Sequence, residues 1–105
     1  LKPAVHYIDG HFTEDSLSLN QVAREVNISA NYLSAVFSQE IGATFTEYVT
    51  GKRMERAKEL LRSTDKRSGE VAAAVGYKDP HYFSFLFKKT QGCTPRDYRN
   101  GGKRP

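Results

Sequence analysis

The hydrophobic positions along the chain follow one pattern twice. Residues 22–48 read VAREVNISANYLSAVFSQEIGATFTEY, and residues 71–98 read VAAAVGYKDPHYFSFLFKKTQGCTPRDY. The early apolar positions of the two segments match at an offset of 49, and the later positions match at an offset of 50. Such a repeat indicates one supersecondary unit built twice. The one-residue slip predicts a turn inside the unit, because an extra residue within a helix would rotate every later side chain off its face.

The first unit begins with two predicted helices. Val5, Ile8 and Phe12 lie at helical spacing and predict a helix over residues 4–13. Ser18 followed by Gln21 is a capping-box pattern, which predicts a second helix from there through residue 26.

A tight turn and a third helix complete the first unit. Asn27 tolerates a left-handed backbone, and Ser29 can cap the helix that follows. That helix is predicted over Ala30–Ile41, and two short helices around a three-residue turn make a helix-turn-helix, although helical bundles form similar corners. Its predicted inward residues are Leu33, Val36, Phe37 and Ile41, and its opposite, small or polar stripe is Asn31, Ser34, Ala35 and Ser38.

A long helix is predicted to join the two units. Gly42 ends the preceding helix, and Thr44 with Glu47 forms another capping box. From there the pattern predicts a helix over residues 44–62, which at about 1.5 Å per residue is a rod of roughly 27 Å. No Pro- or Ser-rich linker intervenes, so we expect a stiff connection between the units.

The second unit repeats the scheme. Ser68 or Gly69 is predicted to cap a helix that runs through Val75, and Asp79-Pro80 starts the next helix after a turn at residues 76–78. Gly92 ends that helix and Thr94-Pro95 starts a short last one, from which Tyr98 packs back on the core. In the middle helix Phe83, Leu86 and Phe87 are expected to face inward and His81, Ser84, Phe85 and Lys88 outward.

These elements predict an all-α fold with four segments. The first helix-turn-helix unit spans residues 1–43, the linker helix residues 44–62, the second helix-turn-helix unit residues 63–100, and a tail residues 101–105. The chain has 105 residues, of which 38% are hydrophobic, enough for one small domain or two very small ones. Its single cysteine, Cys93, excludes an intramolecular disulfide and is compatible with a reducing compartment. No apolar run reaches the length of a membrane span.

The charge of the chain is unevenly distributed. The net charge is +4, but residues 1–51 hold two Lys/Arg against six Asp/Glu, whereas residues 62–105 hold ten against four. This asymmetry indicates that the second half faces a polyanion more strongly than the first, although a solvated basic surface would give the same count.

The two segments resemble the DNA-binding domain of the AraC/XylS family of bacterial transcription regulators. The second segment carries Gly76-Tyr77, Tyr82-Phe83-Ser84, Phe87-Lys88-Lys89, Gly92, Pro95 and Tyr98-Arg99, which follow the family signature. The first segment fits through Ser29, Tyr32-Leu33-Ser34, Phe37, Gly42 and Tyr48, and the linker fits through Arg53, Ala57 and Leu60-Leu61. The resemblance covers residues 5–99.

The resemblance implies seven helices, two helix-turn-helix units and sequence-specific binding of double-stranded DNA in adjacent major grooves, for transcription regulation and in particular activation. It further implies RNA polymerase as a partner, a homodimer formed through a domain absent from this chain, and a location in the bacterial cytoplasm at the nucleoid, without membrane attachment. The alternative is a helical protein-interaction module of the same fold that binds no DNA. The lack of arginine on both predicted reading stripes supports this alternative.

Candidate DNA contacts follow from outward helical spacing and side-chain chemistry. The family often has arginine after the repeated serine, where it can bind a guanine edge, but here those positions are Ala35 and Phe85. We predict that Asn31 reads adenine or a mixed edge and that Ala35 and Phe85 touch thymine methyl groups. The full base-reading set is Asn31, Ser34, Ala35, Ser38, His81, Ser84 and Phe85, and the phosphate set is Lys78, Lys88, Lys89, Arg96, Lys66 and Arg67 together with backbone N–H groups at helix starts.

No pattern in the chain predicts catalysis. His6, His11 and His81 lack metal-ligand spacing, and neither CxxC nor HExxH occurs. Cys93 has no evident His or Asp partner, and the glycines are scattered rather than grouped in a phosphate-binding loop. We therefore expect a binding protein that needs no metal or cofactor and is not an enzyme.

Overall fold

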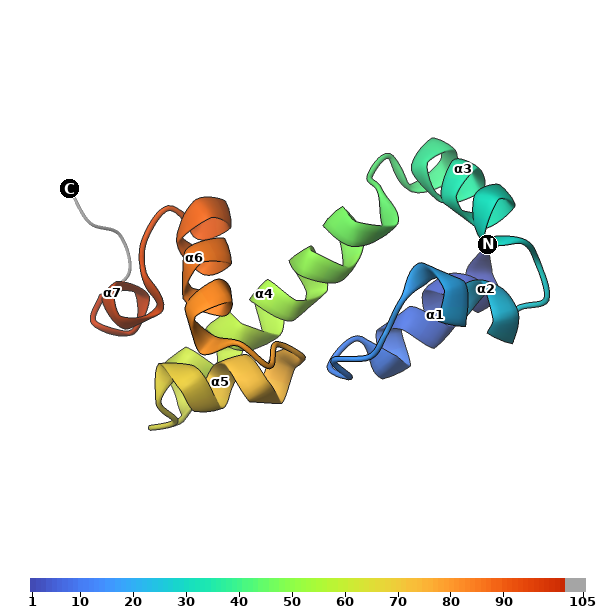
Figure 1. The fold of residues 1–105 in the computed structure, drawn as a ribbon. Helices are drawn as coiled ribbons and strands as arrows, with labels where there is room; N and C mark the ends of the chain where they lie inside the picture. The colour runs from blue at the N-terminus through green and yellow to red at the C-terminus, as the bar shows by residue number, and fades with distance from the viewer. Residues whose placement is uncertain (102–105) are drawn as a thin grey trace. The chain divides into compact units, whose positions relative to one another are not determined.

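The computed structural model describes residues 1–101, and all regular secondary structure in this range is helical (Figure 1). The predicted all-α class is confirmed. The predicted tail at residues 101–105 lies outside the described residues except for Gly101. The helices are α1 (Lys2–His11), α2 (Leu19–Glu25), α3 (Ala30–Ile41), α4 (Phe45–Ser63), α5 (Ser68–Val75), α6 (Pro80–Gln91) and α7 (Pro95–Arg99).

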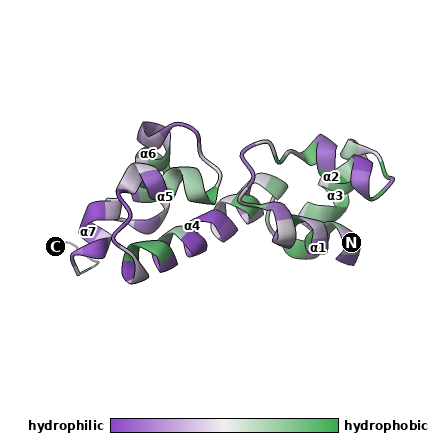
Figure 2. Ribbon diagram, turned by 90° about the horizontal axis from the view of Figure 1, so that it is seen from below, coloured by the Kyte–Doolittle hydropathy of each residue, from purple (hydrophilic) through white to green (hydrophobic). Residues whose placement is uncertain are grey.

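The chain divides into two compact units, one spanning Leu1–Lys52 and one beginning at Arg53. The division falls inside α4, so this helix contributes to both units. Its first part places Val49 in the core of the first unit, and its second part places Met54 and Ala57 in the core of the second. Hydrophobic and hydrophilic residues alternate along α4, as expected for a helix with one buried side (Figure 2).

The core of the first unit is formed by one side of each of its helices. Phe37 of α3 is fully buried and meets the rings of Phe45 and Tyr48 edge-on, at centroid distances of 6.1 and 5.4 Å. Ile41 was predicted to be buried but is 37% exposed, because it is the last residue of α3 and the chain turns away at Gly42. The buried residues are Ala4, Ile8, Val22, Ala23, Leu33, Phe37 and Val49.

Side-chain caps fix where the helices of the first unit begin. The Ser18 hydroxyl accepts from the Gln21 amide at 3.1 Å, but the Gln21 side chain donates to the Tyr7 hydroxyl at 2.9 Å. The predicted capping box is therefore only half formed, since Gln21 instead ties α2 to α1. At the start of α4 the predicted box is complete, with Thr44 and Glu47 each accepting from the other's amide at 3.0 and 2.9 Å.

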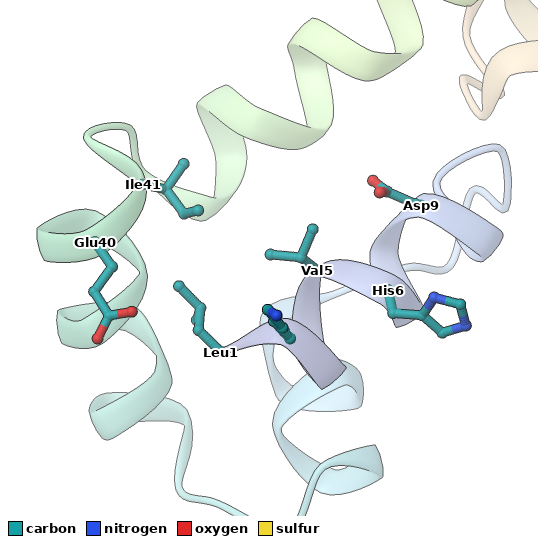
Figure 3. Close-up of a pocket in the computed structure, with 7 residues that line it drawn as sticks. Leu1, Val5, His6, Asp9, Glu40 and Ile41 are labelled. Carbon is teal, nitrogen blue, oxygen red and sulfur yellow. The ribbon is translucent and has the colours of Figure 1, made fainter.

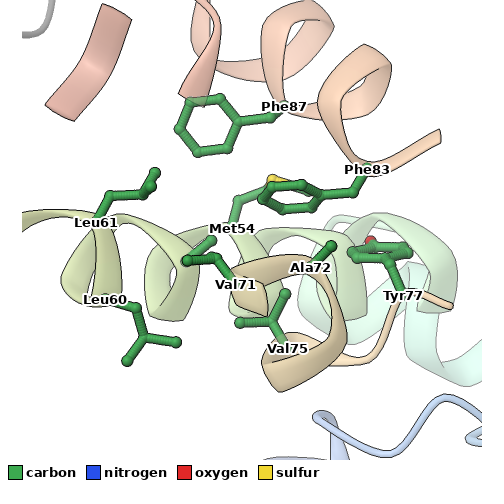
Figure 4. Close-up of a cluster of buried hydrophobic side chains, with 10 residues drawn as sticks. Met54, Leu60, Leu61, Val71, Ala72, Val75, Tyr77, Phe83 and Phe87 are labelled. Carbon is green, nitrogen blue, oxygen red and sulfur yellow. The ribbon is translucent and has the colours of Figure 1, made fainter. Parts of the chain in front are cut away.

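The core of the second unit gathers side chains from α4, α5 and α6. Figure 4 shows Met54 beside Phe83 and Phe87, with Val71 and Val75 projecting from α5. Phe83 and Phe87 are fully buried, and their ring centroids lie 5.8 Å apart. The cluster comprises Met54, Ala57, Leu60, Leu61, Val71, Ala72, Val75, Tyr77, Phe83 and Phe87.

The start of α5 differs from the prediction. Arg67, and not Ser68 or Gly69, is the N-cap residue. Its backbone amide donates to the Glu70 carboxylate at 2.8 Å, so the acidic residue in the first turn of α5 binds the amide of the N-cap residue.

Two arginines fasten α7 to the end of α4. Arg99 donates to the carbonyl oxygens of Leu61 and Thr64 at 3.0 and 2.8 Å, and Arg62 donates to the Tyr98 hydroxyl. The Tyr98 ring meets Phe87 edge-on at 5.9 Å, which confirms that Tyr98 packs back on the core. Arg99 thus satisfies carbonyls that a helix end leaves without a partner, and it is held as part of the fold.

Candidate nucleic-acid interface

The turn of the first helix-turn-helix is set by one left-handed residue and one cap. Asn27 has φ of 61°, and the amide of Ile28 donates to the Ala23 carbonyl at 3.0 Å, which closes the end of α2. Ser29 then accepts from the Tyr32 amide at 3.1 Å and starts α3. The predicted turn and cap are confirmed, and they fix the direction in which α3 leaves α2.

The outward side of α3 carries the four predicted base-reading residues of the first unit. Asn31, Ser34, Ala35 and Ser38 are all exposed. Their polar side chains make no hydrogen bond within the described part of the chain. Because the buried Leu33 and Phe37 hold the other side of the helix, these groups are presented to solvent on a rigid support.

The second turn reproduces the first. The Tyr77 amide donates to the Ala72 carbonyl at 2.9 Å, which matches the Ile28–Ala23 bond of the first unit. Here the left-handed residue is Gly76, with φ of 109°. Arg53 of α4 is only 8% exposed and lies over the Tyr77 ring at 4.9 Å, so this turn is also held by a buried cation.

The outward side of α6 is more apolar than that of α3. Asp79 caps the helix by accepting from the His81 amide at 2.9 Å, with Pro80 in the first turn. His81 and Phe85 are exposed, whereas Ser84 is half-buried and therefore less accessible than its counterpart Ser34.

The predicted phosphate contacts are all exposed cations. Lys78 precedes α6, Lys88 and Lys89 lie in its last turn, Arg96 is on α7, and Lys66 and Arg67 precede α5. None of these six forms an ion pair with another residue in the range 1–101. The Lys89 ammonium lies 5.9 Å from the centroid of the Phe85 ring. The side chains of Ser29 and Asp79 already accept from the amides of Tyr32 and His81. An anion such as a phosphate could therefore bind only the remaining backbone amides in the first turns of α3 and α6.

Two exposed tyrosines on α3 and α6 were not among the predicted DNA contacts. Tyr32 and Tyr82 occupy matching positions in the first turns of α3 and α6, and they are 60% and 51% exposed. In the sequence they mark the repeat and belong to the family signature. Each follows directly after an outward residue, Asn31 or His81, and this position in the sequence could have indicated their exposure.

A surface hollow of about 440 Å³ lies in the first unit, away from the base-reading face of α3. Figure 3 shows Val5, His6 and Asp9 of α1 on one side and Glu40 and Ile41 at the end of α3 on the other. None of the predicted base-reading residues lines it. Its Asp9 is already engaged by the Tyr48 hydroxyl at 3.0 Å and by Lys52 at 3.3 Å.

The described residues hold few other features with binding chemistry. No cluster of three or more His, Cys, Asp or Glu side chains suited to a metal ion occurs in residues 1–101. Within the same range, none of the helices combines the length and apolarity that a membrane crossing requires. Cys93 is a buried, free thiol.

Comparison with known proteins agrees with the repeated geometry. A family model described as a helix-turn-helix domain matches residues 22–101. The uncharacterized HTH-type transcriptional regulator YtdP of Bacillus subtilis is 39% identical over 95 residues, covering 90% of this chain and 12% of YtdP. The arabinose operon regulatory protein of Escherichia coli is 33% identical over 101 residues, covering 96% of this chain and 35% of that protein.

A solved structure is also similar. The C-terminal domain of AraT, a response regulator from Geobacillus stearothermophilus, superposes with a TM-score of 0.94 and 42% identity, covering 99% of this chain and 86% of that one. The chain therefore spans only a small part of the two regulators but most of this solved domain.

Proposed function

The chain belongs to the AraC/XylS family of helix-turn-helix transcription regulators, and from this premise we propose that it binds specific double-stranded DNA sequences, with α3 and α6 each entering a major groove. Its role is DNA-binding transcription regulation. We further propose that it activates transcription and that its two units bind adjacent segments of the major groove. The domain acts by binding, and it needs no catalytic step or cofactor.

One observation carries this proposal. Both units have the same closed turn, the same capped second helix and an outward helix face whose side chains are mostly exposed. A helix held from behind by buried rings and exposed in front is what major-groove reading requires, because base edges are reached only by protruding side chains.

The base-reading roles follow from chemistry. Asn31 can donate to and accept from an adenine edge, and Ser34, Ser38 and Ser84 can bond to several bases. His81 can donate to a purine N7. Ala35 and Phe85 offer apolar contact to thymine methyl groups, so guanine reading by arginine is not part of the proposal.

The phosphate roles fall mainly on the second unit. Its exposed cations at residues 66, 67, 78, 88, 89 and 96 would lie against the DNA backbone, and the first unit adds little positive charge. Since each neutralised phosphate releases counterions, we expect weak binding whose dissociation constant rises steeply between about 50 and 200 mM salt.

Selection of bound duplexes from a random pool tests the proposal directly. Enrichment of one motif, with binding that survives heparin in a gel shift, is the expected result. Binding that is lost to heparin and enriches no motif would mean that the charge alone attracts DNA. A chain that retards no duplex at low salt would favour the helical interaction module, the alternative supported by the missing arginines at positions 35 and 85.

Further partners are proposed from the family. RNA polymerase would be contacted by the DNA-bound protein, and dimerisation would use a domain outside this chain. Both would operate at the nucleoid in the bacterial cytoplasm. Co-purification of RNA polymerase with the chain on promoter DNA, but not with either alone, would support the first.

A further inference from the structure

The outward side of α6 carries aromatic surface that the fold does not use. Phe85 is 61% exposed and Tyr82, one turn earlier, is 51% exposed. Their neighbours Phe83 and Phe87 fill the core and are fully buried. Residues three apart are neighbours on a helix surface, so Tyr82 and Phe85 together form one apolar area facing solvent.

Positive charge lies at the C-terminal end of this apolar area. The Lys89 ammonium lies 5.9 Å from the centroid of the Phe85 ring. Lys88 is exposed in the same turn, and neither lysine has an ion-pair partner among residues 1–101. The surface therefore suits a partner that places a small apolar group beside a negative charge. An apolar patch on a protein or a lipid chain would not need the lysines at its edge.

The thymine edge of the major groove has this chemistry. Its C5-methyl group projects into the groove between the two phosphate backbones, and it is the only apolar group that an unmodified base pair presents there. The corresponding position in α3 is Ala35, whose side chain is a single methyl group. The two units thus differ in the size of the apolar side chain at this position.

On the basis of the proposed function, we propose that Phe85 enables α6 to recognise pyrimidine C5-methyl groups. The half-site of the second unit contains thymine where Phe85 meets the groove, and Lys89 binds the adjacent phosphate while holding the ring. A 5-methylcytosine in that position presents the same methyl group and is distinguished from unmodified cytosine.

The size of the effect follows from the area of one methyl group. Burying a methyl-sized apolar group changes a dissociation constant by about fourfold. Each methyl that Phe85 contacts should therefore contribute about this factor, and replacement of Phe85 by alanine should abolish it.

The test uses the whole chain and the duplex that it selects from a random pool. Each thymidine of that duplex is replaced in turn by deoxyuridine, which removes only the C5-methyl group. At one or two positions we expect about fourfold weaker binding by the wild-type chain and no change for Phe85→Ala. Phe85→Leu should retain the sensitivity, because leucine, unlike the shorter alanine, keeps most of the length and apolar area of the side chain. At the same positions, 5-methylcytosine should bind more tightly than cytosine to the wild-type chain but not to Phe85→Ala.

Three results would overturn the inference while DNA binding stands. These are equal binding of all deoxyuridine duplexes by the wild-type chain, the same set of sensitive positions in Phe85→Ala as in the wild-type chain, and a selected site without thymine in the half bound by the second unit. If no duplex is selected at all, the proposed function fails and this inference fails with it. Circular dichroism checks that each variant folds, which the exposure of Phe85 leads us to expect.

Discussion

Single residues in this chain divide sharply into those that hold the turns and those that face outward. Arg53 illustrates the first kind, since its guanidinium is buried against Tyr77 and Gly76. The family pattern included Arg53, but nothing in the linear sequence predicted its burial, because a charged residue in a helix is usually exposed. Asn27 and Gly76 could be predicted as turn residues, since few residue types tolerate a left-handed backbone.

Gly76 is expected to be the glycine least tolerant of substitution. A Cβ at this position would lie 2.9 Å from Nε of Arg53, and the backbone has φ of 109°. Gly76→Ala should therefore lower the free energy of unfolding by about 2 kcal/mol or more, combining backbone strain with displacement of Arg53. Chemical denaturation measures the loss.

Gly92→Ala is the matched control for this substitution. Gly92 also has a positive φ, of 86°, but a Cβ there would meet nothing within 4 Å. It should cost only the strain, about 1 kcal/mol. Equal losses for the two variants would show that contact with Arg53 is not important.

The Asp9–Tyr48–Lys52 cluster should make the first unit sensitive to alkaline pH. Burial and the hydrogen bond to Asp9 raise the pKa of Tyr48 above its ordinary 10.0. Burial opposes the change in Lys52, but the bond to Asp9 and the nearby charges outweigh it and raise its pKa above 10.5. In both cases the folded state holds the proton more tightly than the unfolded state, so this stability is complete below about pH 10 and is lost as pH rises through the raised pKa values.

Denaturation by urea at pH 8, 10 and 11 measures this loss. Asp9→Asn removes the charge that raises both pKa values, so its stability should fall less over the same interval than that of the wild-type chain. Contributions from the rest of the chain are common to both proteins and cancel in the comparison. Parallel curves for the two proteins would exclude a contribution from the cluster.

At the scale of elements, the sequence predicted the helices well because their ends carry local signals. Ser29, Asp79 and Thr94 act as caps where they were predicted, and Gly42 and Gly92 end α3 and α6. The errors occurred where a helix end depends on a side chain elsewhere. The hydrogen bond to Glu70 makes Arg67 the N-cap residue of α5, and the hydrogen bond to Tyr7 draws the Gln21 side chain away from the start of α2.

The cap of α6 should contribute both to stability and to the geometry of the proposed reading face. Asp79 accepts from the His81 amide at 2.9 Å, so Asp79→Ala should lower the free energy of unfolding by about 1 kcal/mol. Asp79→Ser keeps a capping oxygen and should restore most of that loss. The serine variant also removes a negative charge from the start of the proposed DNA-reading helix, so it should bind selected duplex more tightly than the wild-type chain. Stability measured by thermal unfolding, and affinity measured by gel shift, separate the two effects.

For the molecule as a whole, the repeat in the sequence predicted the all-helical architecture. That the more basic second half meets DNA more strongly stays a prediction. The base-reading residues could be proposed from their outward spacing, but their degree of exposure could not. The half-burial of Ser84 and the exposure of Tyr32 and Tyr82 depend on packing against neighbouring helices. Spacing along one helix records only which side a residue takes, whereas accessibility depends on what else covers that side.

The charge asymmetry makes a prediction that belongs to the whole chain. Lys88→Gln should reduce the slope of log affinity against log salt by about 1, because one phosphate contact and its released counterion are lost. The loss of affinity should be similar for every duplex, since phosphate contacts carry no sequence information.

Lys2→Gln removes the same charge from the first unit, outside both proposed reading faces, and should leave the slope nearly unchanged. Asn31→Ala should behave in the opposite way, altering the preferred sequence while keeping the slope. Equal slopes for Lys88→Gln and Lys2→Gln would mean that the net charge of the chain attracts DNA without fixed contacts, and the assignment of phosphate binding to the second unit would then be wrong.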